Sequence, residues 1–286
     1  MISVVLNAYK RKDLLIKQID SCAKQSIPIS EIVIWNNGDP INGKLLSEKF
    51  GVEIIVVNAS KNIGVWARFS VALNCKSEFI LILDDDVFPG KDFVKNCLDS
   101  FNRLPGLYGS RGLRFISNNR YEPYKEYSWA HPNESIQQVD IVGHSWFFPK
   151  EYLNYFWREN FSSRISPFCG EDIHFSYMLQ KFGGIQTYVP PHPSKFPDMW
   201  GTCPEESYKI GADCHAISQQ SGAMKKFDFA LKFYAKKGFK LILPDKLKVE
   251  VEGVESYSKN WREWLMCKMP FFFRLLVKIK RNVVLK

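Results

Sequence analysis

The sequence predicts an α/β fold in which helices cover both faces of a mostly parallel central sheet. Two features of the first hundred residues predict it: short apolar runs alternate with stretches of helical periodicity, and polar residues follow the apolar runs. Strands that are apolar throughout are typical of parallel sheets, because both of their faces are buried. In such sheets ligands bind at the carboxyl ends of the strands, so the residues after each strand are the site candidates.

The first half of the chain divides regularly into elements. Strands are expected over residues 2–6, 31–35, 53–57 and 78–83, with helices between them over 12–23, 45–50 and 63–74. Beyond residue 86 we expect strands over 107–115 and 139–148, and helices over 92–101, 151–157, 172–182, 206–219 and 225–237. Residues 189–205 are rich in Pro, Gly and Trp and are expected to form an active-site loop or lid.

The basic charge of the chain is concentrated at its C-terminal end. Of the net charge of +9, residues 268–286 contribute +6, which leaves the other 267 residues nearly balanced. A nucleic-acid-binding protein would more often spread basic charge over a binding face, so we expect no nucleic acid partner.

Cysteine usage and the hydropathy pattern predict a cytoplasmic protein. The seven cysteines include no C-x-x-C pair, which favours neither a zinc site nor a disulfide framework and fits a reducing compartment. Residues 1–8 are expected to form a buried strand rather than a signal peptide. No apolar run approaches the roughly 20 residues that span a bilayer.

Asp84, Asp85 and Asp86 directly follow an apolar strand and give the clearest functional signal. Adjacent carboxylates repel one another unless they are solvated or bind a cation. At a strand end they can offer oxygen ligands to Mn²⁺ or Mg²⁺, and that ion could bridge to a diphosphate. The alternative is a solvated acidic turn. An aspartyl-phosphate phosphatase usually has its acid pair on the first strand, and a dinucleotide oxidoreductase needs glycines there, so both are disfavoured.

Five segments in order resemble the nucleotide-sugar glycosyltransferases of the GT-A fold: VVLNAYKRKDLL, IVIWNNG, NIGVWARFSVAL, FILILDDDV, and VGHSWFF followed by GEDI. Within this fold the Trp-Asn-Asn turn, the triple Asp and the later acidic pair resemble the exostosin-like transferases, glycosyltransferase family 64. Family 2 transferases share the general plan. The resemblance covers about residues 1–200.

The resemblance implies a UDP-sugar donor, with the loop after the first strand cradling the nucleotide. Asn7, Ala8 and Tyr9 would supply backbone groups and one ring for the base, and Arg11 would approach a phosphate. The alternative is a plain turn between strand and helix.

Further donor contacts are expected after the second and third strands. Asn36 and Asn37 could hydrogen-bond uracil or ribose, or could simply form a turn. Asn62 precedes a helix, and Arg68 about one turn into it could point a planar fork at the diphosphate. The alternative for Arg68 is a surface arginine.

The resemblance also divides the roles of the acidic triplet. Asp84 would contact ribose or sugar, Asp86 would contact the metal, and Asp85 could serve either role. His192 could supply an imidazole to the metal, as in several GT-A enzymes, or could be a loop residue.

Glu171 and Asp172 begin a predicted helix, where acids also complement the helix dipole. The resemblance places this pair at the acceptor instead. In an inverting enzyme Asp172 would be the general base, whereas in a retaining one the pair would orient the acceptor and stabilise the sugar cation. The exostosin-like resemblance favours retention.

We expect a catalytic domain over residues 1–245 and a C-terminal appendage over 246–286. In the appendage Arg274, Lys278 and Arg281 share one helical face beside an apolar face, which fits a helix in a membrane interface. The protein would then be peripheral on the cytoplasmic face of an anionic membrane. The alternative is a helix packed on the body.

Together these features predict a metal-dependent transferase that moves a hexosyl or N-acetylhexosaminyl group from a UDP-sugar to a saccharide or lipid-linked saccharide. The alternative is a catalytically silent sugar-nucleotide or glycan-binding module at a membrane. A nucleotidyltransferase is disfavoured, because no Gly-rich phosphate loop lies near the first strand.

Overall fold

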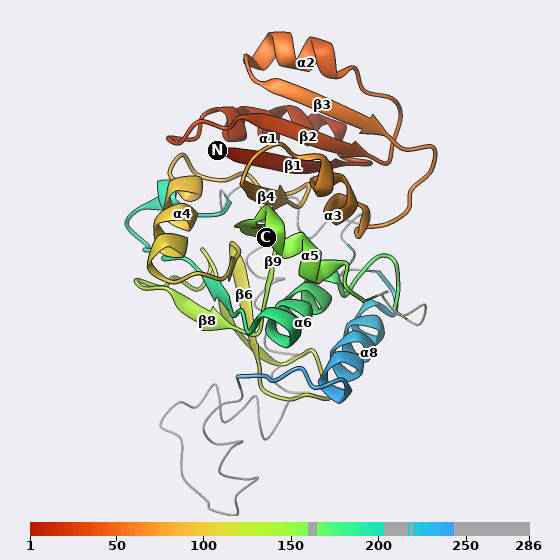
Figure 1. Cartoon of the computed structure of the whole chain (residues 1–286), viewed down its shortest axis with the longest axis vertical. Helices are drawn as coiled ribbons and strands as arrows, with labels where there is room; N and C mark the ends of the chain where they lie inside the picture. Colours follow the sequence, from red (N-terminus) through yellow and green to blue (C-terminus); the bar gives the residue numbers. More distant parts are fainter. Residues whose placement is uncertain (160–164, 203–216, 218–219, 243–286) are drawn as a thin grey trace, which may run out of the picture.

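The structure is a computed structural model, and it describes residues 1–159, 165–202, 217 and 220–242. These residues build an eight-stranded sheet in the order β3-β2-β1-β4-β10-β5-β11-β8, and a three-stranded sheet in the order β7-β6-β9. The predicted α/β class is confirmed. Figure 1 shows β3, β2, β1 and β4 following one another from the top of the view to its centre.

The first half of the chain forms a parallel sheet with a helix after each of its first three strands. The strands are β1 (Ile2–Ala8), β2 (Glu31–Asn36), β3 (Glu53–Asn58) and β4 (Phe79–Leu83), and the helices are α1 (Lys12–Ala23), α2 (Gly43–Phe50) and α3 (Ala67–Val71). The predicted strands match within two residues at either end.

The helix expected over 63–74 begins later than predicted. It starts at Ala67 and ends in a 3₁₀ turn over Ala72–Asn74. The Asn62 side chain accepts the N–H of Gly64 at 2.9 Å, and Gly64 has φ of +88°. A Cβ at Gly64 would lie 2.1 Å from the Pro167 carbonyl oxygen, so this close turn delays the helix.

Two cores lie on opposite faces of the sheet because side chains alternate along each strand. On one face Val4 and Leu6 of β1 share a core with Leu15 of α1. On the other face Val5 shares a core with Phe69 of α3. Coverage of both faces explains why the strand sequences are apolar throughout.

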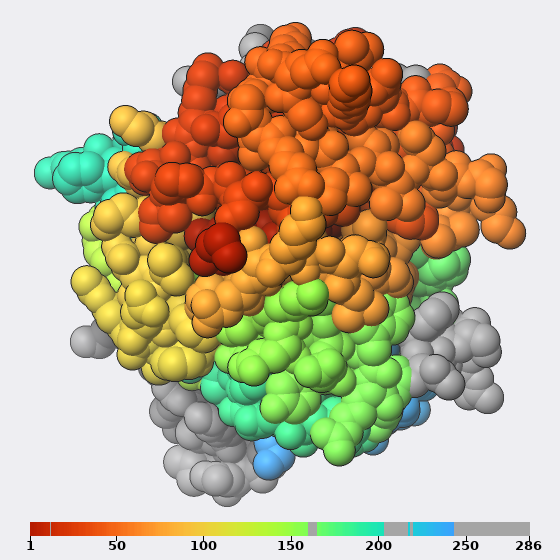
Figure 2. Space-filling view, turned by 45° about the horizontal axis from the view of Figure 1, so that its top comes forward, coloured from red at the N-terminus to blue at the C-terminus, as the bar shows by residue number. Residues whose placement is uncertain are grey.

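The second half contributes the remaining strands and the helices that close the lower part of the molecule. These are α4 (Phe93–Arg103), β5 (Leu107–Tyr108), β6 (Arg111–Phe115), β7 (Tyr124–Tyr127), β8 (Gln137–Val139), β9 (Ile141–Gly143), β10 (Ser145–Pro149), α5 (Leu153–Phe156), α6 (Glu171–Gly183), β11 (Thr187–Val189) and α8 (Ala223–Lys236). In the space-filling view the N-terminal half, red to yellow, and the green segment with α5 form one continuous surface (Figure 2).

The two long strands expected in this half are divided. The strand expected over 107–115 is interrupted at Ser110, whose N–H donates to the Ser145 hydroxyl at 2.8 Å. The run 139–148 breaks at Asp140, whose carboxylate accepts the Phe115 N–H at 2.7 Å, and again at His144, which has φ of +64°. Both breaks depend on distant partners.

Some expectations fall on parts of the chain that are not described. The helix expected over 206–219 lies almost entirely outside the described residues, as does the whole appendage over 246–286. Among the residues that are described, no helix is both long and apolar enough to cross a bilayer.

Candidate active site

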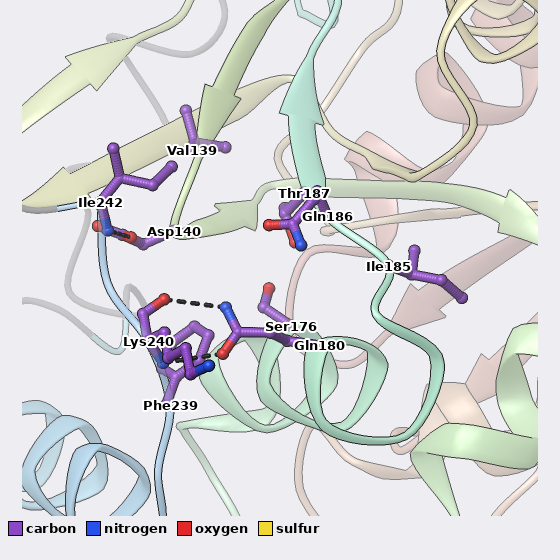
Figure 3. A pocket seen from close by; sticks show the side chains of 10 residues that line it. All are labelled: Val139, Asp140, Ser176, Gln180, Ile185, Gln186, Thr187, Phe239, Lys240 and Ile242. Atoms are coloured by element: carbon purple, nitrogen blue, oxygen red, sulfur yellow. Dashed lines mark hydrogen bonds between the residues drawn. The ribbon is translucent and has the colours of Figure 1, made fainter.

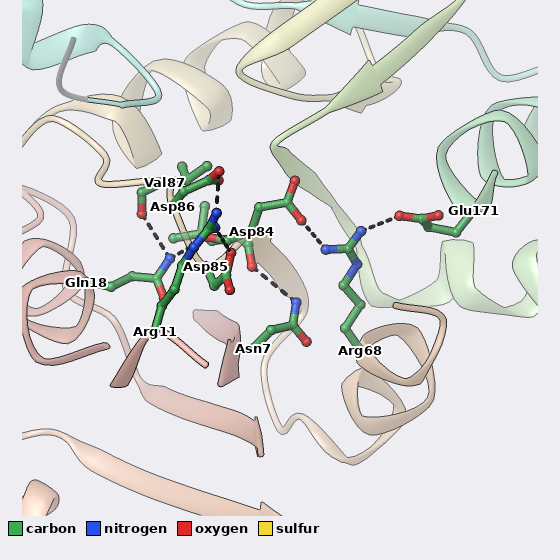
Figure 4. Close-up of polar contacts among 10 residues, drawn as sticks. Asn7, Arg11, Gln18, Arg68, Asp84, Asp85, Asp86, Val87 and Glu171 are labelled. Atoms are coloured by element: carbon green, nitrogen blue, oxygen red, sulfur yellow. Dashed lines mark hydrogen bonds and ion pairs between the residues drawn. The ribbon is translucent and has the colours of Figure 1, made fainter. Parts of the chain in front are cut away.

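The polar residues predicted from the sequence gather at the carboxyl edge of β1 and β4. These strands are parallel neighbours, with Leu6 opposite Leu83, so the loop after β1 faces the acidic triplet after β4. Strand β10 pairs with the other side of β4 in antiparallel register. Figure 4 shows the triplet with one arginine approaching from each side.

Arg11 approaches the triplet from the β1 side. Its Nη1 lies 2.6 Å from Asp85 Oδ1 and 3.4 Å from Asp86 Oδ2, and its side chain is largely buried. Burial raises the pKa of Asp85 to about 6; Arg11 opposes this shift, whereas the charges of Asp86 and Asp84 add to it. The guanidinium thus offsets the mutual repulsion of the carboxylates.

The backbone of the triplet is fixed by α1. Gln18 Nε2 donates to the Asp84 carbonyl at 2.6 Å and to the Val87 carbonyl at 2.9 Å. These two hydrogen bonds of Gln18 were not predicted. A single glutamine on a helix is too common for its sequence position to indicate such a role.

Arg68 approaches the triplet from the opposite side, on α3. Its two Nη atoms form ion pairs with Asp84 and Glu171, and its guanidinium lies 4.2 Å from the centre of the Trp146 ring. The side chain is only 3% exposed. The guanidinium of Arg68, which was predicted to bind a diphosphate, therefore binds two carboxylates in this structure. These two ion pairs connect the end of β4 to the start of α6 (Figure 4).

The acidic pair starts α6, as expected. Asp172 Oδ1 accepts the N–H of Ile173 at 2.7 Å. Burial, and next the charge of Glu171, raise the pKa of Asp172 to about 7. The pKa of Glu171 is raised by burial although Arg68 opposes the shift. A carboxyl group with a pKa near neutrality suits a general base.

The two asparagines after β2 hold their own turn. Asn36 is fully buried, and its amide donates to the Asp39 carbonyl and to Asn58 Oδ1, both at 2.7 Å. Asn37 accepts the Trp35 indole N–H at 2.9 Å. These bonds support the turn interpretation for both side chains rather than base recognition.

The loop after β1 keeps one aromatic face available. Tyr9 is 40% exposed, with Lys10 Nζ 5.4 Å from its ring centre. Asn7 donates weakly to the Leu83 carbonyl at 3.5 Å, and the Ala8 carbonyl accepts the Asn37 N–H at 2.7 Å. Tyr9 is thus the residue of this loop best placed to stack on a base.

His192 is built into the fold rather than turned towards the carboxylates. It is fully buried, its Nδ1 lies 2.9 Å from the Pro190 carbonyl, and its Nε2 accepts the Gly201 N–H at 3.3 Å. Burial lowers its pKa to about 4. With both ring nitrogens engaged, the geometry does not favour the predicted role in metal binding, and the loop interpretation fits.

The carboxylates have the chemistry that a hard divalent cation prefers, although they do not form a closed cage. Within the described ranges, no three His, Cys, Asp or Glu side chains converge as a metal site. Mg²⁺ is usually held by one or two carboxylates together with substrate phosphates. Asp86 is partly exposed and is next to Asp85, so these two carboxylates fit an ion that a diphosphate completes.

Two cavities among the described residues lie away from these acids. One small cavity lies between α6 and the strands β8 and β11, beside Ser176, Gln180 and Asp140 (Figure 3). A larger open groove of about 730 Å³ lies at the amino end of β4, beside Phe79 and Lys150. Neither contains a residue of the predicted site.

An α/β sheet with carboxylates beyond its fourth strand and an acidic pair at a helix start matches the glycosyltransferases of the GT-A fold. The chain belongs to glycosyl transferase family 2, because the model of that family matches residues 3–170, more than half of its length. The comparisons do not support the resemblance to the exostosin-like family. A search of curated proteins finds no significant match.

Two solved structures share this fold. The structure of S. aureus TarS has a TM-score of 0.50 at 15% identity, over 88% of this chain and 46% of that chain. The structure of GalNAc-T7 with UDP, GalNAc and Mn²⁺ has a TM-score of 0.54 at 11% identity, over 89% of this chain and 57% of that chain.

Proposed function

We propose that the protein transfers a hexosyl or N-acetylhexosaminyl group from a UDP-sugar to a hydroxyl of a saccharide or lipid-linked saccharide. The observation that carries the proposal is the convergence of Arg11, Arg68 and four carboxylates at one edge of the sheet. Family membership supports the transfer. The UDP and Mn²⁺ in the similar GalNAc-T7 structure support this donor and this metal.

The donor side lies between β1 and β4. Tyr9 offers its ring to uracil, and Arg11 stands beside the carboxylates where the diphosphate would lie. Asp86, with Asp85, would hold Mn²⁺ or Mg²⁺, which offsets negative charge on the departing UDP. Arg11 contributes a second, fixed positive charge on the same side.

The acceptor side lies at the start of α6. The acceptor oxygen forms a bond to C1 of the sugar, the bond from C1 to the diphosphate oxygen breaks, and UDP leaves with the electron pair. Asp172 takes the acceptor proton, a role that its raised pKa supports. This route inverts the configuration at C1; the earlier preference for retention depended on the exostosin-like resemblance.

Donor hydrolysis without acceptor tests this proposal and separates it from a silent binding module. UDP-sugars are incubated with Mn²⁺, and UDP release is measured; we expect slow release that EDTA abolishes. Asp86→Ala is expected to reduce release at least 100-fold with the fold intact, while Asp99→Ala on the exposed side of α4 leaves it unchanged. Sugar-nucleotide binding without release would favour the silent module, and full activity in EDTA would exclude the metal role.

We also infer that the protein is cytoplasmic and attached to an anionic membrane through residues 268–286. This inference rests on the sequence of the tail, which lies outside the described residues. Flotation with anionic liposomes compares the full chain with a chain truncated after Met266. Equal binding of the two would remove the membrane assignment.

A further inference from the structure

His144 has an unusual backbone conformation directly beside the acidic triplet. It is the one non-glycine residue with positive φ in the described part of the chain, at +64°. Such a conformation costs free energy for a residue with a Cβ and tends to occur at functional sites. Its carbonyl oxygen accepts the Asp84 N–H at 2.9 Å, so the conformation is tied to the end of β4.

His144 is partly exposed. Among the described residues, its imidazole has no hydrogen-bond partner. Burial lowers its pKa to about 4; the positive charge of Arg111 lowers it further, and the negative charges of Asp84 and Glu126 oppose the shift. The ring is therefore neutral at pH 7, with one nitrogen able to donate and the other able to accept. The charges of Arg111, Asp84 and Glu126 are all close enough to act on it.

A polar cluster on β6 and β7 lies next to the backbone that leads into His144, because Arg111 of β6 pairs with Gly143 of β9. Arg111 Nη2 donates to the Tyr124 hydroxyl at 2.8 Å and to Glu126 Oε2 at 2.9 Å, and Ser128 donates to Glu126 Oε1 at 3.0 Å. Burial alone would raise the pKa of Glu126, but Arg111 outweighs it and holds the pKa near 2. The guanidinium of Arg111 is thus fixed in place.

The topology separates this cluster from the nucleotide. Strand β4 lies between β1, whose loop carries Tyr9 and Arg11, and β10, which His144 immediately precedes. If the nucleotide lies on the β1 side of Asp84, the rest of the donor extends towards the β10 side. Arg68 joins Asp84 to Glu171, so Asp172 borders the same region.

We propose that His144 contacts the transferred sugar of the donor, with its imidazole hydrogen-bonding a hydroxyl or carbonyl oxygen between Asp84 and Arg111. The inference rests on the proposed function, since it requires a nucleotide-sugar donor. It makes His144 a residue that senses the sugar and not the nucleotide. The imidazole is uncharged and Arg111 is already paired with Glu126, which fits a neutral hexose or N-acetylhexosamine.

The substitution His144→Gly removes the imidazole without straining the backbone, because glycine adopts positive φ readily. We expect unchanged or higher thermal stability, unchanged affinity for UDP, and about a 10-fold loss of affinity for the UDP-sugar, the size expected for one lost hydrogen bond. His144→Asn tolerates the same backbone and should restore part of the affinity. Asp99→Ala, on the exposed side of α4 and outside this cluster, is the control.

Calorimetric titration with UDP, UDP-glucose and UDP-N-acetylglucosamine, each with Mn²⁺, measures these affinities. The inference is overturned if His144→Gly binds the UDP-sugar as tightly as the wild type, or loses equal affinity for UDP and UDP-sugar. It is also overturned if only the KM of the acceptor changes. If the wild type binds the UDP-sugar but never releases UDP, the transferase function is refuted. The role of His144 is then still tested by comparing the affinities of the wild type and His144→Gly for UDP-sugar and for UDP.

Discussion

Arg68→Met should destabilise the protein strongly, because it removes the positive charge shared by two carboxylates. The methionine keeps an apolar stem of similar length beside Trp146. Glu171 is then left buried, with its side chain 9% exposed and its Oε2 already lacking a hydrogen-bond partner among the described residues. Asp84 is 28% exposed and can recover hydration, so Glu171 dominates the loss.

The magnitude follows from the burial of the pair. Removing one partner of a buried ion pair costs about 3–5 kcal/mol. In a protein of this size each 1 kcal/mol shifts Tm by about 2–4 °C, so we expect a decrease of roughly 6–20 °C. Without Arg68 the pKa of Glu171 rises further, and protonation relieves the penalty at low pH. The loss of stability should therefore grow as the pH rises from 5 to 8.

Thermal unfolding of four variants tests this role: Arg68→Met, Glu171→Gln, the double variant and Lys95→Met. The double variant Arg68→Met with Glu171→Gln should be more stable than Arg68→Met alone by at least about 1 kcal/mol, since it removes the unpaired charge. Lys95→Met, in an exposed pair with Asp99, should leave Tm unchanged. A change below about 1 kcal/mol for Arg68→Met at pH 8, or strict additivity in the double variant, would refute the role of Arg68.

Three further outcomes are expected. Because the pKa of Asp172 is raised from 3.8 to about 7, its contribution to stability is complete below about pH 4 and is lost as the pH rises through 7. Asp172→Asn should thus be more stable than the wild type at pH 8, by on the order of 2 kcal/mol, and equal to it at pH 4, while kcat falls sharply and donor affinity stays. A change in donor affinity alone would contradict its place at the acceptor. Asn36→Ala should lower the free energy of unfolding by about 1–3 kcal/mol, measured in urea, because its amide holds the turn after β2; an unchanged midpoint would restore the base-recognition alternative. Tyr9→Ala should leave stability unchanged and weaken UDP binding by roughly 10-fold or more, the loss of one stacked base; equal UDP affinity would place the base elsewhere.

Local patterns in the sequence were enough to predict the first four strands of the sheet and the positions of the acids. The first four strands were recognisable because buried parallel strands are apolar on both faces, and the carboxyl edge follows from their direction. Asp84–Asp86 and Glu171–Asp172 were found because each cluster is contiguous in the chain. The late start of α3 was missed because it depends on the close approach of Gly64 to Pro167, which is about a hundred residues away.

By itself the sequence determined the α/β class, the family plan and which residues are chemically able to act. Only the tertiary structure decided which groups face one another. Arg68 contacts Asp84 and Glu171, Asn36 holds its own turn, and His192 contacts backbone groups, while the backbone carbonyl of His144 accepts the Asp84 N–H. Strand and helix periodicity act over a few residues, whereas these partners lie up to 103 residues apart. Packing of the two halves, and not any local pattern, sets where each charged group points.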